Sequence, residues 1–272
     1  MADKNLLEIK NVSKQFKLAN GNEIFALKNV NFSVKNGEFV SVIGPSGCGK
    51  STLIKMLAGL TEPTNGQIIE NNKNLDKTSE DRGIIFQNYN LFPWLSVEKN
   101  IGFGLNLRKV DEKLKNKIVS HYIEIVGLRG FEKAYPKELS GGMQQRVALA
   151  RTLVTNPKIM LLDEPFAALD VQTRRFMQDL LLQIWSSEKQ RTIIFVTHDV
   201  EEAVFMSDKV YVLSAGPGTI KEKLDINLPR PRNLKTEFSA DFIKKKEYLQ
   251  KMITKESLKL EKLNLDIYKD LK

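Results

Sequence analysis

The sequence predicts an α/β fold with a mainly parallel sheet, an antiparallel β ribbon at the N-terminus and an inserted helical segment. Two runs of alternating apolar and polar residues near the N-terminus predict the ribbon. Several short runs that are apolar almost throughout are typical of parallel strands buried on both faces. A longer segment with helical spacing separates two of these runs and predicts the helical insertion.

The ribbon is expected to consist of Leu6 to Phe16 and Ile24 to Val34, with Asn20-Gly21 as the tight turn between them. The next element, Phe39 to Ile43, is a short, mostly apolar run that stops at glycines, which predicts a buried strand. Ser51 to Leu60 then has the spacing of a helix. The order is therefore strand, loop and helix.

Three further buried strands are predicted at Gly83 to Phe86, Ile159 to Leu162 and Thr192 to Val196. Each is followed directly by polar residues. Open α/β sheets place their ligands at the carboxyl ends of their strands, so we expect these polar residues to share one site. They are Gln87, Asp163, Glu164, Thr197 and His198.

The helical insertion is expected between Leu91 and Lys137, where apolar residues recur at three-to-four spacing. Those residues are Leu114, Ile118, Tyr122 and Ile125. Two prolines within Pro229 to Arg232 then predict that the chain leaves the main domain, because proline interrupts both helix and sheet. One or two amphipathic helices are expected after this point.

The composition is that of a globular protein, with 42% apolar and 28% charged residues, and excludes a disordered chain or a fibre. No run approaches the roughly 20 apolar residues that a membrane-spanning helix needs. The N-terminus lacks the pattern of a secretory signal, and the single cysteine, Cys48, permits no intrachain disulfide. We expect a cytoplasmic protein. The net charge of +9 is compatible with nucleic acid, an anionic membrane or a solvated basic surface.

The residues between the first buried strand and its helix fit the phosphate-loop pattern G-x-x-x-x-G-K-[ST]. Glycines let backbone N–H groups approach phosphate oxygens, and the helix N-terminus adds positive partial charge. Lys50 supplies a full charge, Ser51 a hydroxyl for Mg²⁺, and Thr52 extends the anion site, whereas Cys48 is expected to be a small filler. The context disfavours an accidental glycine-rich turn. The predicted ATP-binding residues are Gly44, Pro45, Ser46, Gly47, Cys48, Gly49, Lys50, Ser51 and Thr52.

Two adjacent carboxylates follow the apolar strand Ile159 to Leu162. Nucleotide hydrolases use such groups to hold magnesium and to activate water. We expect Asp163 to hold Mg²⁺ and Glu164 to act as the general base. The alternative is an acidic helix start before Pro165.

A second anion site is predicted where Ser140 precedes a helix that includes Val147 to Leu153. Ser140 is a good N-cap, and Gly141 and Gly142 expose backbone N–H groups. Because the phosphate loop already holds one nucleotide, this second site is expected to serve another subunit's nucleotide. Taken alone, an ordinary capped helix would be the better interpretation.

Together these segments resemble the ATP-binding cassette (ABC) family over residues 6 to about 232. Walker A corresponds to Gly44 to Thr52, Walker B to Ile159 to Glu164, and the LSGGQ-type element to Leu139 to Met143, where Met143 replaces the usual glutamine. The resemblance implies a P-loop NTPase core that hydrolyses ATP. It also implies an ABC domain at 1–232, with a helical subdomain at about 91–153, and a basic, helical C-terminal tail at 233–272.

The resemblance assigns roles to four more residues. Phe16 matches the aromatic that stacks on adenine, and a core phenylalanine is the alternative. Gln87 matches the glutamine that meets magnesium and the attacking water, unless it is merely exposed. His198 matches the histidine that contacts the γ-phosphate, the alternative being a satisfied core histidine. Asp170 matches the loop that joins two nucleotide sites across a dimer, whereas His121 matches nothing and is expected to be structural.

The family resemblance implies a head-to-tail homodimer in which ATP lies between Lys50 of one chain and Ser140 of the other. It also implies two transmembrane permease subunits, an extracytoplasmic substrate-binding protein, and a location at the cytoplasmic face of the membrane. Three segments look most like those of importers of nitrate, sulfonates, taurine and pyrimidine precursors. They are Phe92 to Leu95, Leu213 to Ile220 and Leu228 to Arg232. Gly216 and Thr219 replace the arginines usual in those relatives.

Parts of the sequence also suit two other functions. A soluble ABC ATPase acting on nucleic acid or ribosomes would suit the basic charge, but such relatives usually carry a coiled-coil insertion or a second cassette. A P-loop kinase would need neither Leu139 to Met143 nor His198. We therefore expect no nucleic-acid partner.

Overall fold

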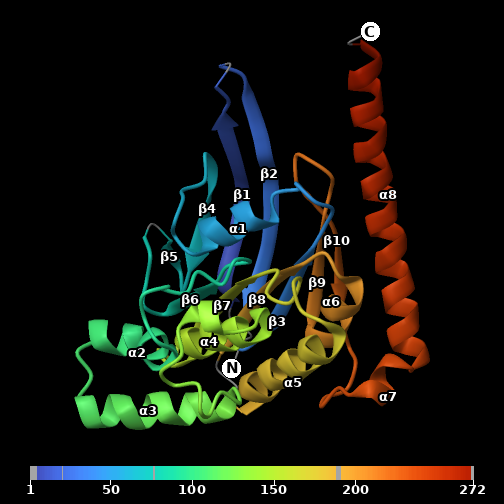
Figure 1. Cartoon of the computed structure of the whole chain (residues 1–272). Helices are drawn as coiled ribbons and strands as arrows, with labels where there is room; N and C mark the ends of the chain where they lie inside the picture. The colour runs from blue at the N-terminus through green and yellow to red at the C-terminus, as the bar shows by residue number, and fades with distance from the viewer. Residues whose placement is uncertain (1–4, 20, 76, 188–190, 271–272) are drawn as a thin grey trace. The chain divides into compact units, whose positions relative to one another are not determined.

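The computed structural model describes residues 5–19, 21–75, 77–187 and 191–270, with side chains up to residue 259. The chain divides into two compact units. Their helices and strands are labelled in Figure 1. Unit 1 comprises Met1–Thr78 and Thr192–Lys272, and unit 2 comprises Ser79–Arg191. Each unit is described by itself.

The N-terminal sheet of unit 1 confirms the predicted ribbon. Strands β1 (Asn5–Lys17) and β2 (Glu23–Lys35) pair antiparallel. Strand β4 (Asn65–Glu70) pairs with the other edge of β1, and the short β5 (Lys73–Asn74) extends the sheet. Of the predicted turn, Asn20 lies outside the described residues.

The second sheet of unit 1 has the strand order β10-β9-β3-β8. Strand β3 (Phe39–Ile43) runs parallel to both β8 (Thr192–Thr197) and β9 (Lys209–Leu213), and every residue of these three strands is buried. Strand β10 (Ile220–Asp225) pairs antiparallel with β9. The parallel strands predicted from their apolar runs are confirmed, whereas β9 and β10 were not predicted.

Helices complete unit 1. Helix α1 (Lys50–Leu57) follows β3 and α6 (Val200–Met206) follows β8. After α7 (Leu234–Glu237), the long helix α8 (Ala240–Asp270) packs against α6 and β9. Up to residue 259, where the description of its side chains ends, Phe242 and Leu249 are its most buried apolar residues, seven residues apart. The predicted domain division near residue 232 stays a prediction.

Unit 2 combines two parallel strands with helices. Strand β6 (Arg82–Ile85) pairs with β7 (Ile159–Asp163), as their apolar runs predicted. The helices are α2 (Val97–Leu107), α3 (Glu112–Ile125), the one-turn 3₁₀ helix η1 (Pro136–Glu138), α4 (Gly141–Leu153) and α5 (Val171–Ser187).

Helix α3 shows where periodicity placed the helix correctly but not its buried side. Its buried residues are Val119 and Ile123, whereas Leu114 is 51% exposed. The packing of α3 on α2 and α4 selects this face, so the apolar spacing alone did not identify it. None of the helices in the described part of the chain is long and apolar enough to cross a bilayer.

Candidate functional site

The phosphate loop connects β3 to α1 in unit 1 and depends on left-handed glycines. Gly47 and Gly49 have φ of +76° and +100°, which strains other residues. A Cβ on Gly49 would also lie 2.7 Å from the carbonyl oxygen of Ala26. Helix α1 starts after Gly49, which offers no side-chain cap to its first N–H groups. This is the backbone arrangement that suits an anion.

Lys50 is held over this loop. Lys50 is only 6% exposed, and its Nζ donates to the carbonyl oxygens of Gly44 at 2.8 Å and Pro45 at 3.1 Å. Burial and these two acceptors restrict the ammonium to the loop, where its charge is poorly screened. The Cys48 side chain is fully buried, as expected of a filler.

His198 leaves the sheet beside the phosphate loop. Ile43 and Thr197 are Cα partners at the ends of β3 and β8, so Gly44 and His198 each follow directly from paired positions. His198 is exposed, which excludes a core histidine. Asp199 then caps α6, accepting from the backbone N–H of Glu201 at 2.8 Å and of Glu202 at 3.2 Å.

Phe16 lies near the end of β1 and is 42% exposed. It is therefore not a core residue. The Lys14 ammonium lies 5.4 Å from its ring centroid, so the ring offers an aromatic face in a positively charged neighbourhood. Unit 1 thus carries Phe16, the whole phosphate loop and His198.

Unit 2 carries the carboxylates and Gln87. Ile85 and Leu162 are partners in the parallel pair β6 and β7. Gln87 and Glu164 each come two residues later, so both lie at the carboxyl ends of these strands. Asp163 is 5% exposed, whereas Glu164 is half-buried and has a φ of +46°. Left-handed backbone is uncommon for glutamate and is found preferentially at functional sites. The structure therefore brings Gln87, Asp163 and Glu164 to the carboxyl end of the same strand pair.

The second predicted anion site lies at the start of α4. Ser140 is its N-cap and accepts from the backbone N–H of Met143 at 3.3 Å. A Cβ on Gly142 would lie 2.8 Å from Cγ2 of Thr173, so the first turns of α4 and α5 are in contact. Asp170 caps α5, accepting from the N–H groups of Gln172 and Thr173, each at 3.0 Å.

Hydrogen bonding holds Asp170 ionised. The Thr173 side chain first, and then the backbone N–H groups, lower the pKa of the Asp170 carboxyl below its usual 3.8. Asp170 therefore stays a charged cap at neutral pH, beside the glycines of α4. Unit 2 places Ser140, Gly142 and Asp170 on two adjacent helix starts.

Sequence reasoning missed a contact behind the phosphate loop. A Cβ on Gly218 would lie only 2.1 Å from the carbonyl oxygen of Cys48, and one on Gly216 would lie 4.0 Å from that of Gly47. In the sequence, Gly216-Pro217-Gly218 indicates only a family motif, although its two glycines signal close backbone approach. Glu256, which bonds to this segment, was also missed.

Comparisons with known proteins fit this geometry. The family described as ABC transporter matches residues 27–167. An aliphatic sulfonates import ATP-binding protein of Bacillus cereus is 48% identical, over 88% of this chain and 93% of the relative. A nitrate import ATP-binding protein of Synechocystis is 45% identical, over 91% of this chain and 94% of the relative.

A solved structure is similar throughout its length. It is a dimeric ATP-binding cassette in a post-hydrolysis state bound to ADP and Pi, with 33% identity and a TM-score of 0.73. The match covers 81% of this chain and 98% of the solved chain. The similarity in sequence and fold leads to one conclusion: this chain belongs to the ABC transporter family.

Proposed function

We propose that this chain is the ATP-hydrolysing subunit of an ABC importer for a small solute. The observation that carries the proposal is the buried Lys50 on a left-handed glycine loop ahead of α1. The sulfonate and nitrate relatives support a small oxyanion as the solute class. They give no support to a role on nucleic acid.

The residues of each unit have distinct roles in this proposal. In unit 1, Phe16 stacks on adenine, the loop N–H groups and Lys50 hold the phosphates, and His198 contacts the γ-phosphate. In unit 2, Glu164 takes a proton from the attacking water as the bond between the γ-phosphorus and the ADP oxygen breaks. The products are ADP and phosphate.

The chemistry of the donor set fits Mg²⁺. The Ser51 hydroxyl, the Asp163 carboxylate and the Gln87 amide oxygen are the oxygen ligands that this ion prefers, and they would hold it. Magnesium neutralises charge on the β- and γ-phosphates when it is bound. Among the described residues there is no group of three or more His, Cys, Asp or Glu that could hold a metal.

A second copy of the chain is proposed to close over the nucleotide. The phosphate loop and the capped start of α4 are two separate anion sites in one chain. The similar solved cassette is dimeric, which supports a homodimer. In this homodimer, Ser140 and Asp170 would face the partner's phosphate loop. ATP would then join the two copies, and hydrolysis would release them.

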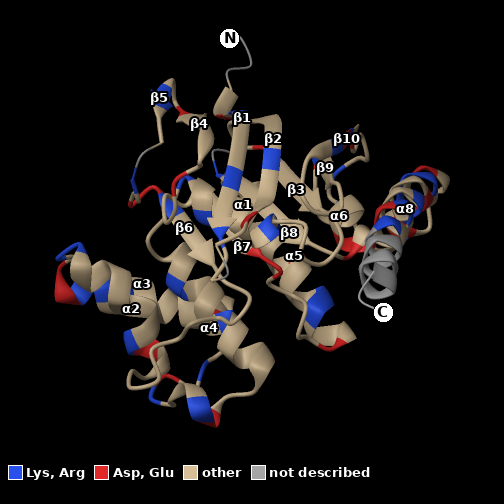
Figure 2. Ribbon diagram, turned by 90° about the horizontal axis from the view of Figure 1, so that it is seen from above, with Lys and Arg blue, Asp and Glu red and all other residues tan. Residues whose placement is uncertain are grey.

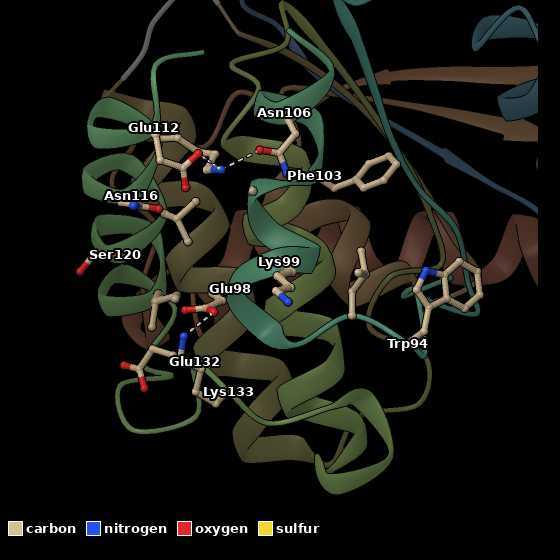
Figure 3. Close-up of a pocket in the computed structure, with 15 residues that line it drawn as sticks. Trp94, Glu98, Lys99, Phe103, Asn106, Glu112, Asn116, Ser120, Glu132 and Lys133 are labelled. Carbon is tan, nitrogen blue, oxygen red and sulfur yellow. Dashed lines mark hydrogen bonds and ion pairs between the residues drawn. The ribbon is translucent and has the colours of Figure 1, made fainter. Parts of the chain in front are cut away.

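The partner that this cycle drives is proposed to dock in a groove of unit 2. A cavity of about 770 Å³ lies between α2 and α3, with Val119 and Ile123 among its lining residues (Figure 3). Ion pairs of Glu98 with Lys133 and of Glu112 with Lys115, at 2.7 and 2.6 Å, line it.

Trp94 lies beside this groove and is 70% exposed. Its ring lies 5.6 Å from that of Phe92, which is 4.4 Å from that of Phe103. A groove lined by both aromatic and charged residues fits an amphipathic helix. Permease subunits would supply such a helix at the cytoplasmic face, and a substrate-binding protein would deliver the solute outside.

A cysteine cross-link tests the docking. Cys48, the only cysteine of the chain, is buried, so Trp94→Cys introduces a single accessible thiol. In native membranes, this variant is expected to cross-link to a membrane subunit identifiable by mass spectrometry. Lys251→Cys, exposed on α8, is the matched control and should not form that product. Equal products from both variants would contradict the proposed docking surface.

Glu164→Gln tests the catalytic part of the proposal. It should retain ATP binding and slow turnover by roughly 10²- to 10⁴-fold, the usual contribution of a general base. The trapped ATP should also make the variant dimerise, which light scattering would detect. Unchanged turnover would remove Glu164 from this role, and a monomer at saturating ATP would contradict the shared site.

A further inference from the structure

The segment Leu213 to Thr219, here called the back wall, lies directly behind the phosphate loop. Gly218 approaches the carbonyl oxygen of Cys48 so closely that a Cβ would be 2.1 Å away, and its N–H donates to Ala26 at 3.0 Å. A Cβ on Gly44 would lie 3.1 Å from the carbonyl oxygen of Leu213. Because these are contacts at or next to the backbone, the phosphate loop cannot keep its shape if the back wall moves.

The back wall is anchored from α8. The backbone N–H of Ala215 donates to Oε2 of Glu256 at 3.0 Å, and both residues are buried, at 8% and 6% exposure. A buried N–H needs a partner, because leaving it unpaired costs the full desolvation penalty. Because this N–H is buried, water cannot replace Glu256 as its acceptor. Glu256 therefore fixes the position of the back wall.

Glu256 occupies an unusual position on its helix. It follows Phe242 and Leu249 at seven-residue intervals and so shares the apolar face that α8 buries. Burial raises the pKa of the Glu256 carboxyl, but hydrogen bonds from Lys259 and Ala215 outweigh burial and lower it overall. A charged carboxylate on a buried helix face is expensive unless it is paired, and here the pairing joins α8 to the back wall.

A second contact of α8 is weaker. Lys246 pairs with Glu201 in the first turn of α6, the helix that begins just after His198. Both side chains are more than 40% exposed, and exposed ion pairs contribute little. Both basic and acidic residues lie along the described part of α8 (Figure 2), so surface charge does not single out any one pair. The contact of α8 that affects the phosphate loop is therefore the buried hydrogen bond between Ala215 and Glu256.

We propose that Glu256 is a positioning residue for the phosphate loop. Acting through the Ala215 N–H, it holds the back wall against the Cys48 backbone and so sets the affinity for ATP. This inference rests on the proposed function, because the position of the loop matters only if the loop binds ATP. It gives the C-terminal helix a role in nucleotide binding.

The test measures the Kd for ATP, the KM for ATP and kcat of the full chain. Glu256→Ala removes the acceptor and should raise Kd and KM about tenfold, since an orphaned buried N–H costs about 1.4 kcal/mol. Its kcat at saturating ATP should stay near that of wild type, because no reacting group changes. Glu256→Gln keeps a carbonyl acceptor and should restore the affinity. Glu247→Ala, exposed on the same helix, is the control and should match wild type.

If Glu256→Ala does not fold, Glu256→Asp replaces it, because the shorter carboxylate keeps its charge but cannot reach Ala215. Wild-type affinity in the Ala or Asp variant overturns the proposal. An affinity for Glu256→Gln as weak as for the truncating variant overturns it as well. A wild-type chain that binds no ATP overturns both this inference and the proposed function, whereas normal binding in every Glu256 variant overturns only this inference.

Discussion

Ile43 and Thr197 are paired at the carboxyl ends of two adjacent parallel strands, so the phosphate loop and His198 leave the sheet at the same level. This register places an exposed imidazole next to the proposed γ-phosphate site. We therefore expect His198 to contact the terminal phosphate.

His198→Ala should therefore lower kcat by about 10²-fold, the lower end of what a positioned polar group contributes. The Kd for ATP should change little, because Lys50 and the loop still hold the phosphates. Steady-state turnover and nucleotide titration would measure both. His121→Ala is the matched control, since His121 is the other histidine and is exposed on α3. An unaltered kcat for His198→Ala would exclude the assigned contact.

Lys50→Ala should abolish tight ATP binding. Two charge-assisted hydrogen bonds to phosphate would be lost, which lowers affinity by about 10²-fold or more. Isothermal titration with ATP would measure this loss. Lys55→Ala, exposed on the same helix, removes the same charge at a position away from the loop and should bind normally. Normal affinity in Lys50→Ala would refute the phosphate-binding role itself.

Asp170 should contribute stability that depends on pH. Its folded pKa lies below the unfolded value of 3.8, so the contribution is fully present above that value and disappears as pH falls through the folded pKa. Amide exchange at Gln172 and Thr173 should accelerate in that acidic window. Asp170→Asn, which still accepts both N–H groups, should show no such pH dependence. A titration midpoint at or above 3.8 in the folded chain would contradict this prediction.

Arg232→Ala should destabilise the fold by about 2–4 kcal/mol, because it orphans several buried carbonyl oxygens at once. Arg232 donates to the carbonyls of Val204, Phe205 and Ser207 at 2.6–3.0 Å. Burial lowers its pKa to about 10, so it remains charged at neutral pH. Urea unfolding would measure the loss.

The control is Arg230→Ala. Arg230 pairs with Asp208 at 2.7 Å, but both side chains are partly exposed, at 25% and 34%. Its removal should cost less than 1 kcal/mol or so, as for other solvated pairs. Equal losses for Arg230→Ala and Arg232→Ala would contradict the role of Arg232 as an anchor of α6.

Much of the local structure could be predicted because it depends on neighbouring residues. The phosphate loop needs glycines at left-handed positions, and Gly47 and Gly49 have them. Ser140 predicted its helix start through its side-chain oxygen. Periodicity found α3 but did not identify its buried face, because the helices packed on α3 decide which side loses contact with water.

The sequence by itself determined the family, the phosphate loop and the positions along the chain of four parallel strands, β3, β6, β7 and β8, since each depends on residue type and spacing along the chain. Only the tertiary structure decided that Glu256 reaches Ala215 and that Gly218 contacts Cys48. These pairs are separated by 41 residues in the first case and by far more in the second, so no local pattern links them. Burial makes both contacts matter. No water can replace Glu256 as the partner of the Ala215 N–H, and there is no space for a Cβ at Gly218.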